Sequence, residues 1–423
     1  MIEFPNTRSI LASCVARESY TPPGARRMAE YLESFSNEWK LGETHLVDFP
    51  KGFPFAHVRP TPCNVYIDIP PTQPGGEWML WLNHFDSIDP TGHYPVGRDP
   101  LELTTEPGDS DLCYGLKCND PMGGVVAMLV AAHLLQQRNE RRHGVRMLLV
   151  CGEEDQSQGV HAALSQNLVD DRITCLVGTD ILVGDTLQGP ARLGIGRPGR
   201  VGLQVNIEGV DMHAGDYSDD KYPQLASTRE AWINLALPTI QFPERPEQHY
   251  QQYMPRSRCT ISQWSSGKTH GLSVAKEATV NVDVIYGNPE LDEVVIKAAV
   301  RDALQRTLQD HNIREPDDVM TVVREPGRKM DFTKPYLEAP NSPLVQTCLN
   351  IMRQRLGEVV LCAAKGTADE PVVVHRKRIP GVIIAPRGRG EHTDGECVSL
   401  KSIDETAAVL ADLACHDGPL TQR

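Results

Sequence analysis

The first part of the chain alternates short apolar runs with longer segments of helical periodicity. Apolar side chains spaced three and four residues apart predict helices over 23–39 and 123–137. Short apolar runs between turn residues predict strands, over 63–70, 77–86, 145–154 and 173–180. Strands that alternate with helices in this way are typical of an α/β fold with a mostly parallel sheet and helices on both faces.

A different pattern begins near residue 195 and ends near residue 326. Alternating apolar and polar residues predict long strands, and helical spacing predicts two helices, with the strands over 200–214 and 277–287 and the helices over 228–240 and 289–311. The α/β pattern then returns and ends in a helix where Ser402 and Glu405 have the spacing of a capping box. We therefore predict an α/β domain of residues 1–195 and 327–423, with an α+β domain of residues 196–326 inserted into it.

Side chains that can bind metals follow the predicted strands at several points. Parallel strands place ligand-binding side chains at their carboxyl ends, and the candidates here are His84, Asp86, Asp120, Glu153, Glu154, Asp180 and His392. Taken singly, each is more often a surface-turn or solvated residue. The adjacent carboxylates Glu153 and Glu154 would repel each other in a buried site unless a cation lay between them. Because such side chains recur at successive strand ends, we predict a site for Zn²⁺, Mn²⁺ or Co²⁺, among which these ligand types do not choose.

In their order along the chain, these residues resemble the dinuclear-metal exopeptidases and deacylases that include carboxypeptidase G, aminoacylase and succinyl-diaminopimelate desuccinylase. The resemblance covers the His-x-Asp motif at 84–86, the aspartate before a Gly-Gly helix start at 120–124, the Glu-Glu pair, the later aspartate and the C-terminal histidine. It also covers the segment "GVDMHAGDYS" of the inserted domain, which in that family forms a lid that often dimerises. The resemblance implies one or two divalent metal ions per subunit and a homodimer or higher oligomer through the lid.

The resemblance also implies the role of each metal ligand. Asp120 would bridge two ions, His84 and Asp180 would complete one site, and Glu154 and His392 would complete the other.

Three further roles follow from the same resemblance. Glu153 would act as general base and acid, and Asp86 would orient His84. His213 would stabilise an oxyanion, in this family commonly in the active site of the neighbouring subunit. The resemblance further predicts a cis peptide bond between Asp120 and Pro121.

The chain departs from the family pattern in ways that bear on its substrate. The loop "CNDPMGG" lacks the family's lysine, and Ile285 stands where an arginine commonly contacts a substrate carboxylate. Arg387 and Arg389, just before His392, are candidates to bind an anionic group instead, although solvated arginines are equally typical of such a loop.

These features predict an enzyme that uses metal-activated water to hydrolyse a C–N bond of a small molecule. The altered loop and lid resemble an aromatic aminohydrolase of this family, which would convert 5-nitroanthranilate to 5-nitrosalicylate and ammonia. The alternative is an amidohydrolase, deacylase or carboxypeptidase that acts on N-acyl or N-carbamoyl amino acids. A non-catalytic relative that binds a small molecule is the alternative of another class.

The composition of the chain limits the kinds of partner and the cellular compartment that we expect. The net charge of −14 over 423 residues argues against a nucleic-acid or anionic-membrane partner. We see no signal peptide and no apolar run near the ~18 residues that span a bilayer. Eleven cysteines without a CxxC pair predict reduced thiols and a cytoplasmic protein. The glycines of "GIGRPG", residues 194–199, match a dinucleotide fingerprint, but Pro198 interrupts it and a strand is predicted to follow, so we do not predict a nucleotide site.

Overall fold

The computed structural model divides the chain into two compact units. Unit 1 consists of Met1–Arg197 and Tyr336–Arg423, and unit 2 of Pro198–Pro335. The structure describes residues 3–53, 61–73, 75–95, 97–106, 108–138, 140–154, 156–182, 184–208, 212–213, 234, 236–266, 273–274, 277–310, 320–324 and 333–421. The sequence predicted the boundaries at 195/196 and 326/327. The second boundary lies later because Thr333 belongs to unit 2, where its carbonyl accepts hydrogen bonds from the Arg200 amide and the Tyr286 hydroxyl.

Unit 1 is built on an eight-stranded sheet of order β1-β2-β6-β3-β7-β18-β8-β17. The pairs β6/β3, β3/β7, β7/β18 and β8/β17 are parallel, as predicted for most of the sheet, whereas β1/β2, β2/β6 and β18/β8 are antiparallel. The strands are β1 (Glu43–Asp48), β2 (Cys63–Ile69), β3 (Trp78–His84), β6 (Gly144–Val150), β7 (Ile173–Gly178), β8 (Ala191–Gly194), β17 (Val359–Cys362) and β18 (Gly381–Ile383).

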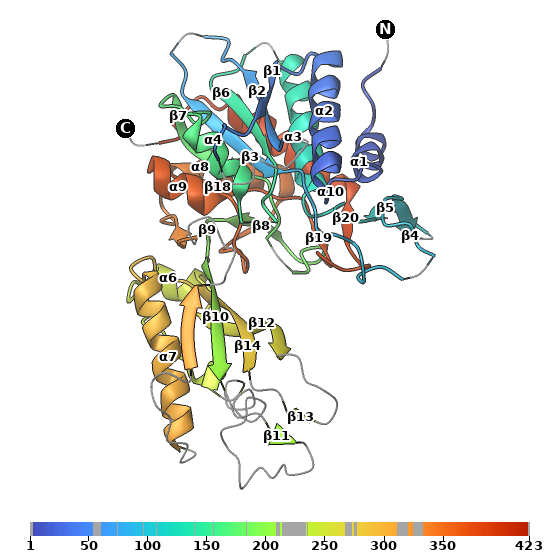
Figure 1. Cartoon of the computed structure of the whole chain (residues 1–423). Helices are drawn as coiled ribbons and strands as arrows, with labels where there is room; N and C mark the ends of the chain where they lie inside the picture. Colours follow the sequence, from blue (N-terminus) through green and yellow to red (C-terminus); the bar gives the residue numbers. More distant parts are fainter. Residues whose placement is uncertain are drawn as a thin grey trace. The chain divides into compact units, whose positions relative to one another are not determined.

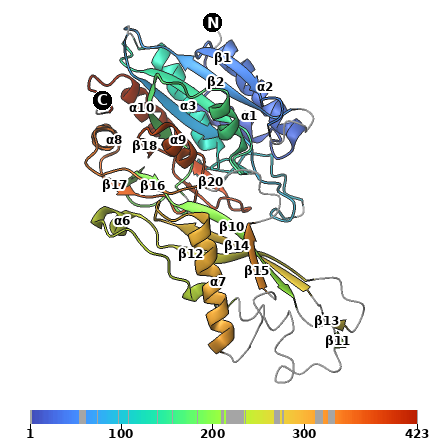
Figure 2. The ribbon, with the colours of Figure 1, turned by 60° about the vertical axis from the view of Figure 1, so that its left-hand side comes forward.

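Two groups of helices cover the two faces of this sheet (Figures 1 and 2). On one face α3 contacts α1 and α10, and α8 contacts α10; on the other face α4 contacts α9. Apolar side chains of β3, β6 and β7 pack against α4 and α9 in one buried cluster. The helices are α1 (Thr7–Val15), α2 (Pro22–Glu38), α3 (Met122–Gln136), α4 (Gln158–Ser165), α8 (Pro343–Leu356), α9 (Glu370–Lys377) and α10 (Leu400–Ala414).

Helix α10 begins earlier than its sequence suggests. Ser399 is the N-cap, with extended φ and ψ, and its hydroxyl accepts a hydrogen bond from the Ser402 amide. Ser402 is therefore already inside the helix, and the predicted capping box at Ser402 and Glu405 is wrong. The nearer serine caps the helix because its backbone is extended at the end of strand β20 (Cys397–Ser399).

A small antiparallel sheet of order β19-β20-β5-β4 extends unit 1. The hairpin between β19 (Gly388–Arg389) and β20 carries the loop that contains His392. Strand β20 also pairs with β5 (Asp109–Tyr114), which leads into the loop before α3 and in turn pairs with β4 (Thr104–Glu106). The small sheet thus brings two distant loops side by side.

Unit 2 has its own antiparallel sheet of order β12-β14-β10-β15. Alternate residues of β14 are buried, and they pack with β10 and α7 in a separate apolar cluster. The strands are β10 (Gly199–Glu208), β12 (Arg258–Ser266), β14 (Glu277–Tyr286) and β15 (Met320–Arg324), and the helices are α6 (Gln248–Tyr253), α7 (Glu293–Asp310) and the 3₁₀ helix η2 (Leu237–Thr239). The predicted helix over 228–240 falls largely outside the described residues, and its described end is the 3₁₀ turn η2.

Each unit also contains one pair of two-residue strands among its described residues. In unit 1, β9 (Gly196–Arg197) pairs with β16 (Tyr336–Leu337). In unit 2, β11 (Met212–His213) pairs with β13 (Ser273–Val274). Across the described residues, no helix combines the length and the hydropathy that a membrane span requires.

Candidate metal centre

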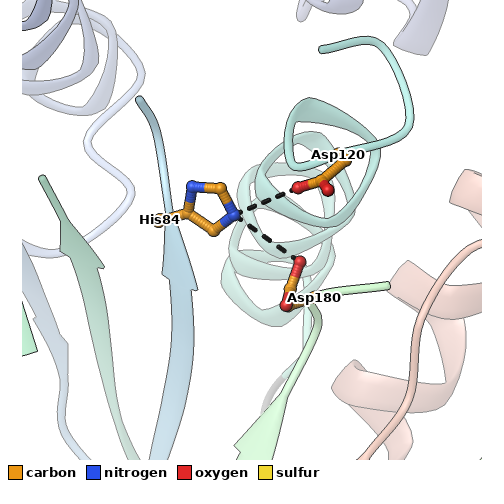
Figure 3. Close-up of side chains that lie close together, drawn as sticks. All are labelled: His84, Asp120 and Asp180. Atoms are coloured by element: carbon orange, nitrogen blue, oxygen red, sulfur yellow. Dashed lines mark hydrogen bonds and ion pairs between the residues drawn. The ribbon is translucent and has the colours of Figure 1, made fainter. Parts of the chain in front are cut away.

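Three buried side chains converge at the ends of neighbouring elements of unit 1. His84 ends β3, Asp180 follows β7 and Asp120 precedes α3. His84 Nε2 lies 3.1 Å from Asp120 Oδ1 and 3.6 Å from Asp180 Oδ1. Figure 3 shows the imidazole facing both carboxylates. One potential ligand atom from each residue lies within 4.8 Å of the others. The three residues therefore form one candidate metal site.

A second group shares Asp120 with the first. His392 Nε2 lies 3.5 Å from Asp120 Oδ2 and 3.1 Å from Glu154 Oε1, and the three residues again offer ligand atoms within 4.8 Å of one another. The two oxygens of Asp120 thus face two different histidines. This is the arrangement that a carboxylate bridging two ions requires, and all five predicted ligands take part in it.

The backbone before Asp120 is held by Glu396, which follows His392 in the β19–β20 loop. Glu396 is 1% exposed, and its carboxylate accepts hydrogen bonds from the amides of Lys117, Asn119 and Asp120 at 2.9–3.0 Å. This clamp joins the loop of Asp120 to the loop of His392. The Asp120–Pro121 peptide bond is cis, which confirms that prediction.

Asp86 occupies the position behind His84. Its Oδ1 lies 3.5 Å from His84 Nδ1, and its two oxygens accept hydrogen bonds from the amides of Glu153 and Glu154 at 3.2 and 3.3 Å. One carboxylate therefore lies against the imidazole and also accepts hydrogen bonds from the backbone of the Glu-Glu pair.

The clustered carboxylates of the centre favour positively charged groups beside them. Burial lowers the pKa of His84, but Asp120, Asp180 and Asp86 more than compensate, so that the pKa lies well above its usual value. Hydrogen bonds to Asp120 and Glu154 raise the pKa of His392 to about 11. Protons on both imidazoles would partly offset the clustered carboxylates, and divalent cations would offset them more completely.

Glu153 lies beside the first site without being part of either ligand group. It lines a narrow pocket together with His84 and Asp180. Burial, with Asp369, Glu154 and Asp180 nearby, raises the pKa of its carboxyl group well above the usual value. A carboxyl group in this environment is suited to taking up and releasing a proton.

The residues fit divalent metal ions. Asp180 Oδ1 is buried without a hydrogen bond among the described residues although it lies next to two other ligand atoms. Each group offers one imidazole and two carboxylates, a donor set typical of zinc or manganese sites. A cation would satisfy the orphaned oxygen and separate the acids.

The family of the chain follows from a comparison with known protein families. The profile described as Peptidase family M20/M25/M40 matches residues 80–416. The chain belongs to this peptidase family. The family predicted from the sequence is therefore confirmed, and with it a class of hydrolases that act on peptide and amide C–N bonds.

Individual relatives of this M20 chain are distant. Carboxypeptidase G2 from Pseudomonas sp. (strain RS-16) is 24% identical over 243 residues, 57% of this chain and 52% of that protein. A probable succinyl-diaminopimelate desuccinylase from Staphylococcus epidermidis is 30% identical over 105 residues, 25% of each chain. The chain thus spans about half, or less, of the length of these curated relatives. The M20 family metallo-carboxypeptidase Sso-CP2 from Sulfolobus solfataricus has the same fold, with a TM-score of 0.71 at 15% identity over 97% of this chain and 99% of that one.

Besides Asp86 and Glu153, three further predicted site residues of the M20 chain are not among the two ligand groups. His213 lies in strand β11, and its side chain is outside the described residues. Arg387 and Arg389 line a hollow of about 470 Å³ whose lining includes none of the five metal ligands. Arg387 donates to the Gly189 carbonyl, and Arg389 lies 3.6 Å from Asp185. Oxyanion stabilisation by His213 and substrate binding by the two arginines remain predictions.

Sequence reasoning missed two side chains that hold the ligands in place. Glu396 is part of the stretch that contains His392, but its hydrogen-bond partners lie about 280 residues earlier. Arg197 contacts Asp180 from within the glycine pattern at 194–199, which has no local feature that points to a metal. A lone glutamate or arginine in a turn is typical of solvent-exposed positions, so only the three-dimensional contacts reveal them.

Proposed function

We propose that the chain is a metal-dependent amidohydrolase or peptidase that cleaves an amide C–N bond in a small substrate. The observation that carries the proposal is the shared aspartate: the two oxygens of Asp120 face two imidazoles, each of which has a second carboxylate beside it. A pair of divalent ions held there would polarise the substrate carbonyl and supply hydroxide at neutral pH.

The chain's own residues would handle orientation and proton transfer. Glu153, which lines the same narrow pocket as His84 and Asp180, accepts a proton from the attacking water and delivers it to the departing nitrogen. Asp86 fixes the ring of His84 and the backbone of Glu153 at the same time. His213 is the proposed oxyanion donor, on the family resemblance alone.

The substrate class that fits best is an N-acylated or N-carbamoylated amino acid or a small peptide. The relatives named above are by their names a carboxypeptidase and a desuccinylase. They lend no support to the predicted aromatic aminohydrolase acting on 5-nitroanthranilate. That reaction stays a second candidate because the loop at 118–124 and the lid at Ile285 depart from the family pattern. We also propose that the native metal is zinc or manganese. The protein would be cytoplasmic and would form a dimer through unit 2.

Glu153→Gln provides the test, because glutamine keeps the shape of the side chain but cannot carry the proton. We expect kcat to fall by about 10²–10⁴-fold with little change in KM, while the bound metal measured by plasma mass spectrometry stays the same. Glu140→Gln is the matched control, because it makes the same change at an exposed glutamate. This variant should keep wild-type turnover.

The substrate panel separates the two candidate reactions. N-acyl amino acids, N-carbamoyl amino acids, dipeptides and aminobenzoates are incubated with the metal-loaded protein, and released amine, ammonia and new carboxylate are measured separately. A new carboxylate with a free amine supports amide hydrolysis, whereas ammonia from an aminobenzoate supports the aminohydrolase. Turnover that Glu153→Gln leaves unchanged would contradict the mechanism for either reaction.

A further inference from the structure

Arg197 is a fully buried cation between two acidic side chains of unit 1. Its side chain is 0% exposed, and its Nη2 lies 2.9 Å from Asp180 Oδ2. Its Nε lies 2.8 Å from Glu370 Oε2, at the first residue of α9. Burying a guanidinium costs several kcal/mol, so such a residue persists where its partners offset that cost. The partners here are a candidate metal ligand and a glutamate that belongs to neither ligand group.

The two oxygens of Asp180 have different surroundings as a consequence. Oδ2 accepts a hydrogen bond from Arg197, whereas Oδ1 is buried without one among the described residues and lies 3.6 Å from His84 Nε2. A guanidinium presents its donors in a fixed planar fork. Arg197 uses one of these donors, Nη2, for both Asp180 Oδ2 and Glu370 Oε1, so the position of Oδ2 is tied to that of the glutamate. The same Nη2 also donates to the carbonyl of Ile181, the next residue, which fixes the backbone there.

The glycine pattern at 194–199 explains how Arg197 reaches this position. Arg197 lies in β9, which pairs with Tyr336 and Leu337 of β16. A Cβ atom on Gly196 would lie 2.4 Å from the Tyr336 carbonyl oxygen, closer than real atoms approach. Glycine therefore allows the two strands to come together and brings the next side chain, Arg197, against Asp180. The pattern that resembles a nucleotide fingerprint thus serves a packing role in this part of the chain.

We propose that Arg197 is a positioning residue for the metal ligand Asp180. It holds Oδ2 so that Oδ1 remains directed toward His84 as a single-oxygen ligand for a divalent ion. This inference rests on the proposed metal-dependent function, since it assigns a role toward the ion that His84 and Asp180 would share. The competing explanation is purely structural, namely that Arg197 serves only to neutralise Glu370 in the core.

Paired substitutions distinguish the two explanations. Arg197→Met alone leaves two buried acids without their shared cation and is expected to destabilise unit 1. Arg197→Met/Glu370→Gln removes the cation and one acid together, which costs less stability because the net charge of the buried group is unchanged and only Asp180 loses its partner. Glu370→Gln is the matched control, because it changes the same glutamate and keeps the arginine on Asp180. Arg197→Lys keeps the charge but loses the fork.

Each variant is prepared together with His392→Ala, which removes a ligand of the second site and leaves the His84 site to be measured. Cobalt affinity is determined by competition with a chelator, and the visible spectrum of bound Co²⁺ reports its coordination geometry. We expect Arg197→Met/Glu370→Gln to bind Co²⁺ about 10–100-fold more weakly than Glu370→Gln and to show an altered spectrum. Arg197→Lys should fold and shift the affinity in the same direction.

The outcomes separate this inference from the proposed function. If the His392→Ala protein with Arg197 intact binds no cobalt at the His84 site, the proposed metal centre is wrong and the inference falls with it. If that protein binds cobalt, and the double variant and Arg197→Lys bind it as tightly with the same spectrum, Arg197 has only a structural role. In that case the proposed function stands without it.

Discussion

Three aspartates of the centre each divide their two oxygens between different partners. Asp120 faces one histidine with each oxygen, and Asp180 faces His84 with one and Arg197 with the other. Asp86 combines two backbone amides with the ring of His84. A short carboxylate on a rigid backbone has little rotational freedom once both oxygens are engaged, as in Asp120 and Asp86, whereas Asp180 is held through Oδ2 alone.

The first prediction concerns the carboxylate behind His84. Asp86→Asn keeps the size of the side chain but replaces one oxygen with an NH₂ group, which cannot accept a hydrogen bond from an amide. One of the amides of Glu153 and Glu154 then loses its acceptor, and His84 can lose the group that orients its ring. We expect metal affinity to fall about 10–100-fold, measured by competition with a chelator. Asp89→Asn, an exposed neighbour in the same loop, should leave the affinity unchanged.

The sequence singled out the five candidate ligands as a set, but not the side chains that contact them. His84, Glu154 and Asp180 follow strands whose hydrophobic runs are plain, and metal-binding side chains at strand ends are informative as a set. Arg197 and Glu396 act through side-chain contacts that depend on the packing of short strands and loops. Nothing in their local sequence distinguishes them from exposed turn residues.

At the scale of elements, the approach of α3 to the sheet places the bridging ligand. The first turn of α3 contains Gly123 and Gly124. A Cβ atom on Gly124 would lie 2.1 Å from the Thr179 carbonyl oxygen and 2.3 Å from Asn83 Nδ2, so the helix meets the ends of β7 and β3 there without side-chain atoms between them. Asp120 reaches the centre because this contact is so close.

Gly124→Ala should therefore destabilise the fold more than Gly123→Ala does. Overpacking costs about 1–3 kcal/mol, which outweighs the gain of about 1 kcal/mol that alanine brings to a helix. Gly123→Ala is the matched control, since its Cβ would meet its nearest neighbours at 3.1–3.2 Å and needs only a small adjustment. We expect a lower melting temperature and weaker metal binding for Gly124→Ala alone, by calorimetry and chelator competition. Equal melting temperatures in the two variants would rule out the close helix–sheet contact.

Elements with long, unambiguous periodicity were predictable, and short ones were not. Helix α7 and strand β14 follow the hydrophobic pattern over many residues. By contrast, the start of α10 depends on the backbone of Ser399 in a three-residue strand, and the two-residue strands β9 and β16 have no pattern of their own. Elements this short are defined by what they pack against.

At the scale of the whole molecule, each unit has an apolar core of its own, and all five candidate ligands belong to unit 1. The changes of hydrophobic period near residues 195 and 326 were enough to predict this division. The exact position of the second boundary was not predictable, because it depends on Thr333 pairing with the first strand of unit 2.

Metal removal should consequently affect the two units differently. An ion that binds only the folded state stabilises it by about 2.7 kcal/mol at one hundred times its dissociation constant, which corresponds to roughly 5–10 °C for a domain of this size. Chelation also leaves Asp120, Glu154 and Asp180 facing one another without a cation between them. We expect a chelator to lower the melting transition of unit 1 by that amount and to leave the transition of unit 2 in place. Hydrogen exchange assigns the transitions, since amides of β6 and β7 should lose protection at temperatures where β10 and β14 keep theirs. If the chelator shifts both sets of amides equally, or neither, the stabilising ion is not confined to the centre described here.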